Sequence, residues 1–196
     1  MNFFSKKHTI FLCLASCLYI SSCTSFMAAT NDGAVSEDYG KRTMGTVLED
    51  SSIESKAKIN ISRYNEILNN ANINVTSYNR IILLTGQVPD IESKNQAGLV
   101  AEKVRNVRSV HNELEILPVN SIFDSSKDSF LKAKVSTNLL GAKGVDSDRI
   151  QVIVANSKVY LMGLVTQEEA KRTIDSVKEV SGLKAIIKVF EYIQNS

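Results

Sequence analysis

The clearest pattern of apolar and polar positions lies near the C-terminus. Residues 159–164 (V-Y-L-M-G-L) form an apolar run of strand length that is rich in β-branched and aromatic residues. Thr166 and Glu169 then form a capping box, which predicts the start of a helix. The apolar positions of this helix recur at helical spacing: Ala170, Ile174 and Val177. Gly182 ends the predicted helix, and residues 183–193 form a second predicted strand.

The same pattern occurs a second time, earlier in the chain. Residues 81–88 (I-I-L-L-T-G-Q-V) match the run around Gly163, and residues 106–116 match the strand at the C-terminus. A helix and a strand precede each copy, so the chain contains two modules of order α-β-β-α-β. The remaining predicted elements are helices over 51–68, from residue 90 and over 128–140, and strands over 72–78, 110–117 and 149–155. The inward face of the helix over 51–68 is Ile53, Ala57, Ile61, Tyr64 and Leu68.

These elements predict an α+β fold made of two tandem modules. In each module two strands form a hairpin and the third joins through a helical crossover, so both helices must cover one face of a three-stranded mixed sheet. The predicted division of the chain is a leader over 1–22, a tether over 23–49, the first module over 50–117, a linker over 118–126, the second module over 127–193 and a tail over 194–196.

The leader has the features of a signal peptide. Lys6 and Lys7 precede an apolar core over 10–20, and small residues follow. The other interpretation is a transmembrane anchor, but this core is too short to cross a bilayer.

All 3 Cys lie at positions 13, 17 and 23, so the modules contain neither a disulfide nor a Cys-based metal site. The segment I-S-S-C, which ends at Cys23, resembles a bacterial lipobox, and a second match ends at Cys17. We favour lipidation of Cys23, because cleavage before Cys17 would leave a very short apolar core. Ordinary cleavage near Ala28 remains the alternative. Thr24 follows Cys23 where an Asp would signal inner-membrane retention, so the resemblance implies the outer membrane.

The charge is unevenly distributed. The chain carries a formal net charge of +2, and both of the excess charges are Lys6 and Lys7 of the leader. A neutral processed chain argues against bulk binding of nucleic acid. Residues 49–117 have a net charge of −1 and residues 127–193 a net charge of +3, so any preference for anions belongs to the second module. The segment between Thr24 and Glu49 is polar and predicts a flexible tether with a reach of roughly 25–30 Å.

The doubled module with a Gly in its second strand resembles the BON domain, and two such domains behind a lipobox resemble the outer-membrane lipoproteins of that family. The matching segments are I-N-V-T-S-Y at 73–78, V-H-N-E-L at 110–114, V-Y-L-M-G-L-V-T-Q-E-E-A at 159–170 and R-T-M-G-T at 42–46. The resemblance implies an acylated protein on the periplasmic face of the outer membrane. It also implies binding to anionic phospholipid and support of membrane integrity, without enzyme activity. We expect no cofactor, no metal and no small-molecule substrate.

The family places its lipid contact at an aromatic residue on the first helix of the second domain. Here Phe130 lies on the side of the helix opposite its predicted core face, Leu131, Val135 and Leu139. The residues expected beside it are Lys127, Lys134 and Thr137. Phe130 replaces the family's Trp and so lacks an interfacial N–H. The alternative is that Phe130 folds back as a staple at the helix start. Ser52 holds the matching position of the first module.

Two further features are predicted to be structural. Gly86 and Gly163 lie inside strands, and we expect a helix to pass close over the sheet at each. Tyr160, Met162 and Leu164 point to the sheet face that the helices do not cover, and Phe190 and Tyr192 are expected to join them. Packing of the two modules on each other is the favoured cover for this face, and a ligand groove is the alternative.

No catalytic set is recognisable in the sequence. His111 stands alone in the modules. Five acidic residues of the second module fall at predicted caps and turns, where acids are expected: Asp128, Asp146, Asp148, Glu168 and Glu169. The sequence therefore favours a binding protein over an enzyme. The alternative to phospholipid binding is a scaffold that meets a partner of the outer-membrane assembly machinery through the same surfaces.

Overall fold

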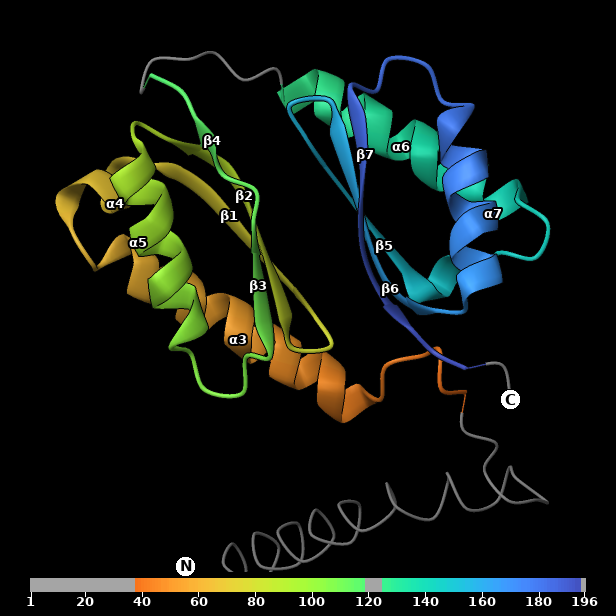
Figure 1. Ribbon diagram of the computed structural model, residues 1–196, viewed down its shortest axis with the longest axis horizontal. Coiled ribbons are helices and arrows are strands. Elements are labelled where there is room, and N and C mark those ends of the chain that lie inside the picture. Colours follow the sequence, from red (N-terminus) through yellow and green to blue (C-terminus); the bar gives the residue numbers. More distant parts are fainter. Residues whose placement is uncertain (1–37, 119–124, 195–196) are drawn as a thin grey trace, which may run out of the picture. The chain divides into compact units, whose positions relative to one another are not determined.

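The computed structural model describes residues 38–118 and 125–194, and these form two α-β-β-α-β modules (Figure 1). The first module consists of α3 (Met44–Ser62), α4 (Glu66–Asn70), β1 (Asn72–Tyr78), β2 (Ile81–Val88), α5 (Ile91–Glu102), β3 (Ser109–Asn112) and β4 (Glu115–Ile116). The second consists of α6 (Ser125–Gly141), the 3-10 helix η1 (Ser147–Arg149), β5 (Ile150–Ala155), β6 (Lys158–Val165), α7 (Gln167–Lys178) and β7 (Ala185–Tyr192). The predicted α+β fold is confirmed.

Each module has the predicted mixed sheet. β1 is antiparallel to β2, which is parallel to β3 and β4, and β5, β6 and β7 repeat this arrangement. In the first module Ile82, Leu84 and Val88 of β2 pack with buried residues of α3 and α5, so both helices cover one sheet face. Val159, Leu161 and Val165 of β6 pack in the same way beneath α6 and α7.

A carboxylate on the first helix of each module holds the hairpin turn. Both central residues of each turn have positive φ: Asn79 and Arg80 in the first module, Asn156 and Ser157 in the second. Asp50 of α3 accepts hydrogen bonds from both turn N–H groups, at 2.8 and 2.7 Å. Asp128 of α6 does the same at 2.7 Å for each bond. The turn N–H groups are therefore satisfied by the helix that crosses the sheet.

Two element predictions for the first module are wrong. The helix predicted over 51–68 begins at Met44, ends at Ser62 and resumes as α4, because the chain breaks between them. Tyr64 lies in this break and is 54% exposed, so it does not belong to the core. The strand predicted over 110–117 is split into β3 and β4, and Leu114 in the split is buried in the core beneath the helices.

The two glycines are structural, but the reason predicted for them is wrong. A Cβ at Gly86 would collide with the carbonyl oxygen of Asn72 on the neighbouring strand β1, and Gly86 has a φ of 118°. A Cβ at Gly163 would approach the carbonyl oxygen of Arg149, which holds the matching position beside β5. The hairpin partner, rather than a helix, demands glycine at both positions.

The end of the predicted tether is part of the folded unit. Residues 39–43, here called the strap, contact both modules before α3 begins. Arg42 donates to Asp50 at 2.8 Å and lies 3.9 Å from the ring centroid of Tyr78. Lys41 lies 3.6 Å from Asp146 of the second module, and its Nζ is 3.9 Å from an Asp148 oxygen. Residues 44–49, which the sequence assigns to the tether, therefore belong to α3, which begins within the R-T-M-G-T segment.

The sheet faces that the helices leave uncovered pack against each other. Their buried cluster joins Tyr78, Ile81 and Leu83 of the first module to Tyr160, Met162 and Val189 of the second. Module packing is thus the cover, as favoured from the sequence. Phe190 packs in the core beneath the helices instead, and Tyr192 is 55% exposed, so their predicted place in this face is wrong. The parallel register explains the shift, because it pairs Val189 with Met162.

The contacts between the modules are reciprocal. Asn79 Nδ2 donates to Glu191 Oε2 at 2.7 Å, and Asn156 Nδ2 donates to Glu115 Oε2 at 2.6 Å. Each carboxylate also forms an ion pair. Arg108 lies 2.6 Å from Glu191, and Lys158 lies 3.0 Å from Glu115. The hairpin turn of each module therefore contacts the last strand of the other, and the two modules are related by an approximate two-fold axis.

Candidate functional site

The helix α6 presents two different faces. Leu131, Val135 and Leu139 are 3%, 0% and 1% exposed and pack on the sheet side, as predicted. Phe130 is 64% exposed, which places its ring on the solvent side of the helix. The alternative in which Phe130 folds back as a helix-start staple is therefore excluded. An exposed aromatic ring suits contact with an apolar phase.

A lysine accompanies the exposed ring. Lys134 lies one helical turn after Phe130, and its Nζ is 5.4 Å from the ring centroid, within the range of a cation–π contact. Thr137 is exposed two turns after Phe130, and Lys127 is exposed one turn before it. The structure thus brings Phe130 and Lys134 into contact and places Lys127 and Thr137 along the same side of α6. We call these four residues the α6 face.

The matching helix of the first module lacks this combination. Ser52 stands at the position of Phe130, and Glu49 stands at the position of Lys127. Glu49 accepts a hydrogen bond from Asn106 Nδ2 at 2.8 Å, so its carboxylate is engaged within the first module. Lys56 does match Lys134, so charge alone does not distinguish the helices. The feature unique to α6 is the aromatic ring.

The sequence analysis missed two residues near the end of α6. Leu140 is 73% exposed, and Lys143 follows the helix and is also exposed. Lys143 lines an open groove of about 490 Å³ between α6 and α7, together with Thr137 and Arg172. The helical wheel contained the signal for Leu140, because this leucine falls outside the arc of the core residues. Leu140 and Lys143 therefore add one apolar and one cationic side chain near the C-terminal end of α6, while Asp175 and Glu179 place two carboxylates in the same groove.

Clustered ligand side chains and displaced pKa values are the features that mark a metal or catalytic site. Within residues 38–118 and 125–194, no group of three or more His, Cys, Asp and Glu side chains is placed to hold a metal ion. Burial, together with the nearby Glu113 and Glu115, raises the pKa of Tyr160 to about 12. This tyrosine lies in the interface between the modules, so its displaced pKa reflects packing.

Two predictions about the membrane concern residues at the start of the chain. The proposed lipidation residue, Cys23, lies outside the described residues, as does the signal peptide. Among the helices that the structure describes, none is both long and apolar enough to cross a membrane.

Comparison with known proteins identifies both modules. The model of the BON domain matches residues 49–118 and 127–194. The chain is 33% identical over 182 residues to outer membrane lipoprotein DolP of Haemophilus influenzae, covering 92% of this chain and 93% of that protein. It is 28% identical to a 21 kDa hemolysin of Actinobacillus pleuropneumoniae, covering 78% of this chain and 79% of that protein. It is 26% identical to osmotically-inducible protein Y of Escherichia coli, covering 80% of each. The similarity to outer membrane lipoprotein DolP confirms the outer-membrane localisation that the sequence predicts.

Proposed function

Because the chain belongs to the BON domain family, we propose that it is a lipid-anchored envelope protein that binds anionic phospholipid through the α6 face. Binding holds the two modules against the periplasmic leaflet and supports the integrity of the outer membrane. The protein acts by binding and has no enzymatic activity. Cys23 carries the anchor, and residues between it and the strap form the connection to the folded unit.

The observation that carries this proposal is the exposed ring of Phe130 beside Lys134. The ring supplies an apolar group that gains free energy on leaving water, about 2 kcal/mol for a buried phenylalanine. Lys127 and Lys134 each add about 1 kcal/mol near an anionic surface. The net charge of +3 over residues 127–193 has the matching sign.

These contributions predict a weak and reversible site. Their sum is about 4 kcal/mol, which corresponds to a dissociation constant of about 1 mM. Attachment to an anchor through a short tether supplies an effective concentration of the same order, roughly millimolar. The anchored protein therefore exchanges between docked and undocked states, and the local content of anionic lipid sets how long it stays docked.

Co-sedimentation with liposomes tests this function. The chain from Thr24 onward contains the whole compact unit, Tyr39–Ser196, and lacks the predicted lipidation residue Cys23. We expect it to sediment with vesicles of phosphatidylglycerol and to stay in solution with vesicles of phosphatidylcholine. Equal behaviour with both vesicles would contradict the proposal.

The second candidate function is a protein-interaction scaffold that meets a partner of the outer-membrane assembly machinery. A groove on the first module favours it, because that groove is apolar and lies outside the α6 face. Under this candidate, the chain would bind no vesicles, and crosslinking would capture a defined partner at the first module.

A further inference from the structure

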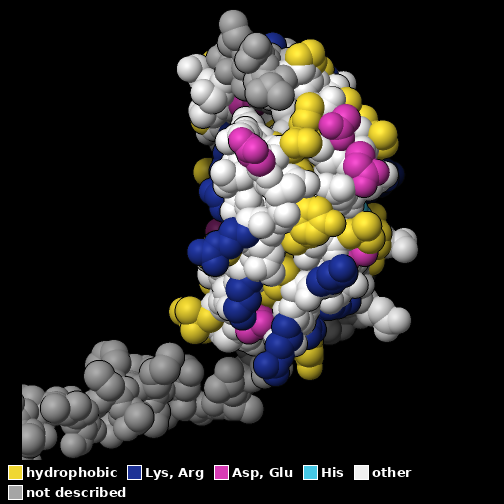
Figure 2. Space-filling model, turned by 90° about the vertical axis from the view of Figure 1, so that its left-hand side faces the viewer, with side chains coloured by type: hydrophobic (Ala, Val, Ile, Leu, Met, Phe, Trp, Pro, Cys, Tyr) yellow, Lys and Arg dark blue, Asp and Glu magenta, His cyan; other side chains and the backbone are white. Residues whose placement is uncertain are grey.

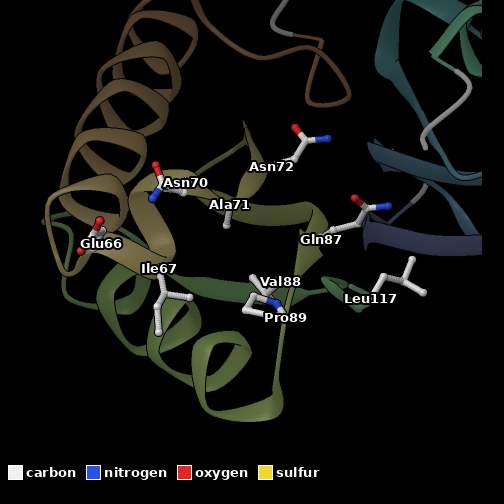
Figure 3. Close-up of a pocket in the computed structure, with 9 residues that line it drawn as sticks. All are labelled: Glu66, Ile67, Asn70, Ala71, Asn72, Gln87, Val88, Pro89 and Leu117. Carbon is white, nitrogen blue, oxygen red and sulfur yellow. The ribbon is translucent and has the colours of Figure 1, made fainter. Parts of the chain in front are cut away.

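A groove of about 370 Å³ opens at the end of the first module's sheet (Figure 3). Its apolar lining comes from α4, from the start of β1, from the end of β2 and from the segment after β4: Ile67, Ala71, Val88, Pro89 and Leu117. Its polar lining is Glu66, Asn70, Asn72 and Gln87. Asn72 and Gln87 are partners in the β1–β2 register. The groove is thus an apolar surface bordered by amides and one carboxylate.

The approximate two-fold relation between the modules identifies the matching surface of the second module. Ile73 pairs with Gly86 in one hairpin, and Ile150 pairs with Gly163 in the other, so Asn72 corresponds to Arg149. By the same register Ala71 corresponds to Asp148. Two of the groove residues, Ala71 and Asn72, therefore have counterparts in η1.

On the second module this matching surface is covered by the chain's own strap. Gly40 is buried so closely against Arg149 that a Cβ there would clash with the guanidinium group. Lys41 reaches Asp148 at 3.9 Å and Asp146 at 3.6 Å. The strap is neither helix nor strand at these residues. The second module thus holds a short irregular segment at Arg149 and Asp148, the counterparts of Asn72 and Ala71.

The first module has no equivalent cover among the described residues. Tyr78 contributes to the cover on the second module, because its hydroxyl donates to Arg149 O at 2.8 Å. The residue related to Tyr78 by the two-fold is Ala155, whose methyl group is too short to reach Asn72. Gln87, which pairs with Asn72 in the β1–β2 register, is 9% exposed, and its Nε2 has no hydrogen-bond partner in the structure. Such an unsatisfied buried donor is costly and suits an incoming carbonyl.

We propose that this groove binds a short linear peptide segment of a partner protein. An apolar side chain of the peptide fills the space between Ile67 and Val88. A basic residue pairs with Glu66, as Lys41 of the strap pairs with aspartates on the other module. This site is separate from the α6 face and does not depend on phospholipid binding.

The surroundings of the groove agree with an apolar and basic peptide. Figure 2 shows exposed hydrophobic side chains on the helical side of the first module, with acidic side chains gathered in the upper half of the view. Exposed apolar residues of α4 and α5 are Ile67, Ile91 and Leu99, at 50%, 58% and 57%. The first module has a net charge of −1 over residues 49–117, which is opposite to the sign of the second.

The test selects random linear peptides displayed on phage against the chain from Thr24 onward and measures the selected peptides by fluorescence anisotropy. Ala71→Trp fills the groove, and Asn74→Trp places the same bulk on an exposed position of β1. We expect Ala71→Trp to weaken binding by about tenfold or more, and Asn74→Trp to leave it within about twofold. Ile67→Asp places a charge in the groove without filling it, and we expect it to weaken binding as well. Ile59→Asp is its control, because Ile59 is an exposed residue of α3 outside the groove.

Three results would overturn the proposal. One is a selection that yields no peptide, and another is a set of peptides that bind Ala71→Trp and Ile67→Asp as well as the unchanged chain. The third is displacement of the selected peptides by phosphatidylglycerol vesicles, if this displacement is lost in the Phe130→Glu variant. The peptides would then occupy the α6 face. Loss of binding in both groove variants, with both controls unaffected, supports it.

Discussion

The guanidinium carbon of Arg42 lies 3.9 Å from the centroid of the Tyr78 ring. Arg42 also pairs with the buried carboxylate of Asp50, and the Tyr78 hydroxyl donates to Arg149 of the second module. Burial raises the pKa of Tyr78, and the positive charge of Arg42 offsets part of that effect. A residue that precedes the first helix therefore stabilises both the hairpin turn of the first module and its contact with the second.

Replacement of Arg42 tests the strap. Arg42→Ala leaves Asp50 buried without its cation, and we expect a loss of about 2 kcal/mol in the free energy of unfolding. Lys41→Ala is the control, because its partly exposed pairs at 3.6 and 3.9 Å contribute below about 1 kcal/mol. Urea unfolding measures both. Equal stability of the two variants would show that the strap does not hold the fold.

The packing between the sheets predicts that a charge at Met162 is severely destabilising. Met162 is 1% exposed in the interface between the modules, so Met162→Asp buries an unpaired carboxylate. We expect a loss of about 3 kcal/mol or more, seen as a lower melting temperature. Tyr192→Asp on β7 is the control, since this side chain is 55% exposed. An unchanged melting curve for Met162→Asp would rule out the interface.

Alkaline pH should weaken the same interface through Tyr160. Its pKa in the folded protein is raised to about 12 from the ordinary 10.0, so the folded state holds the phenolic proton more tightly than the unfolded chain does. The protonated Tyr160 hydroxyl makes its full contribution to the free energy of unfolding below about pH 10, and this contribution is lost as the pH rises toward 12. Urea unfolding as a function of pH should show this loss, and Tyr160→Phe should reduce it. A Tyr160→Phe chain with the same alkaline loss would assign the effect to other groups.

The anchor is predicted to be Cys23. Stable attachment requires more than one acyl chain, since a single chain binds only marginally. Cys23→Ser should block processing or release the protein from the outer-membrane fraction, as judged by fractionation and labelling with palmitate. Cys17→Ser is the control and should be processed normally. If only Cys17→Ser blocks processing, the lipobox has been placed wrongly.

The elements that depend on local pattern were predictable from the sequence. The strands at Asn72–Tyr78 and Ile81–Val88 have the predicted limits, and Thr166 caps α7 by accepting from Glu169 N, as the capping box implies. The solvent-facing position of Phe130 followed from the helical period. In these cases the information lies within a few residues of the feature it determines.

The features that depend on contacts distant in the sequence were not predictable. Arg42 belongs to a polar stretch that is typical of a tether, and only Asp50 and Tyr78 in the folded chain give it a structural role. The need for Gly86 arises from the carbonyl oxygen of Asn72 across the hairpin. The groove of the first module is lined by residues as distant in the sequence as Ile67, Val88 and Leu117, which only the fold brings together.

The central claim, binding of phospholipid through the α6 face, is tested most directly by co-sedimentation of paired variants with phosphatidylglycerol vesicles. Phe130→Glu changes a 64% exposed residue, so the circular dichroism should remain that of the unchanged chain. Ser52→Glu makes the matching change on the first module. The account predicts that Phe130→Glu abolishes sedimentation with the vesicles and that Ser52→Glu does not. Retained sedimentation of Phe130→Glu, or equal loss in both variants, would contradict it.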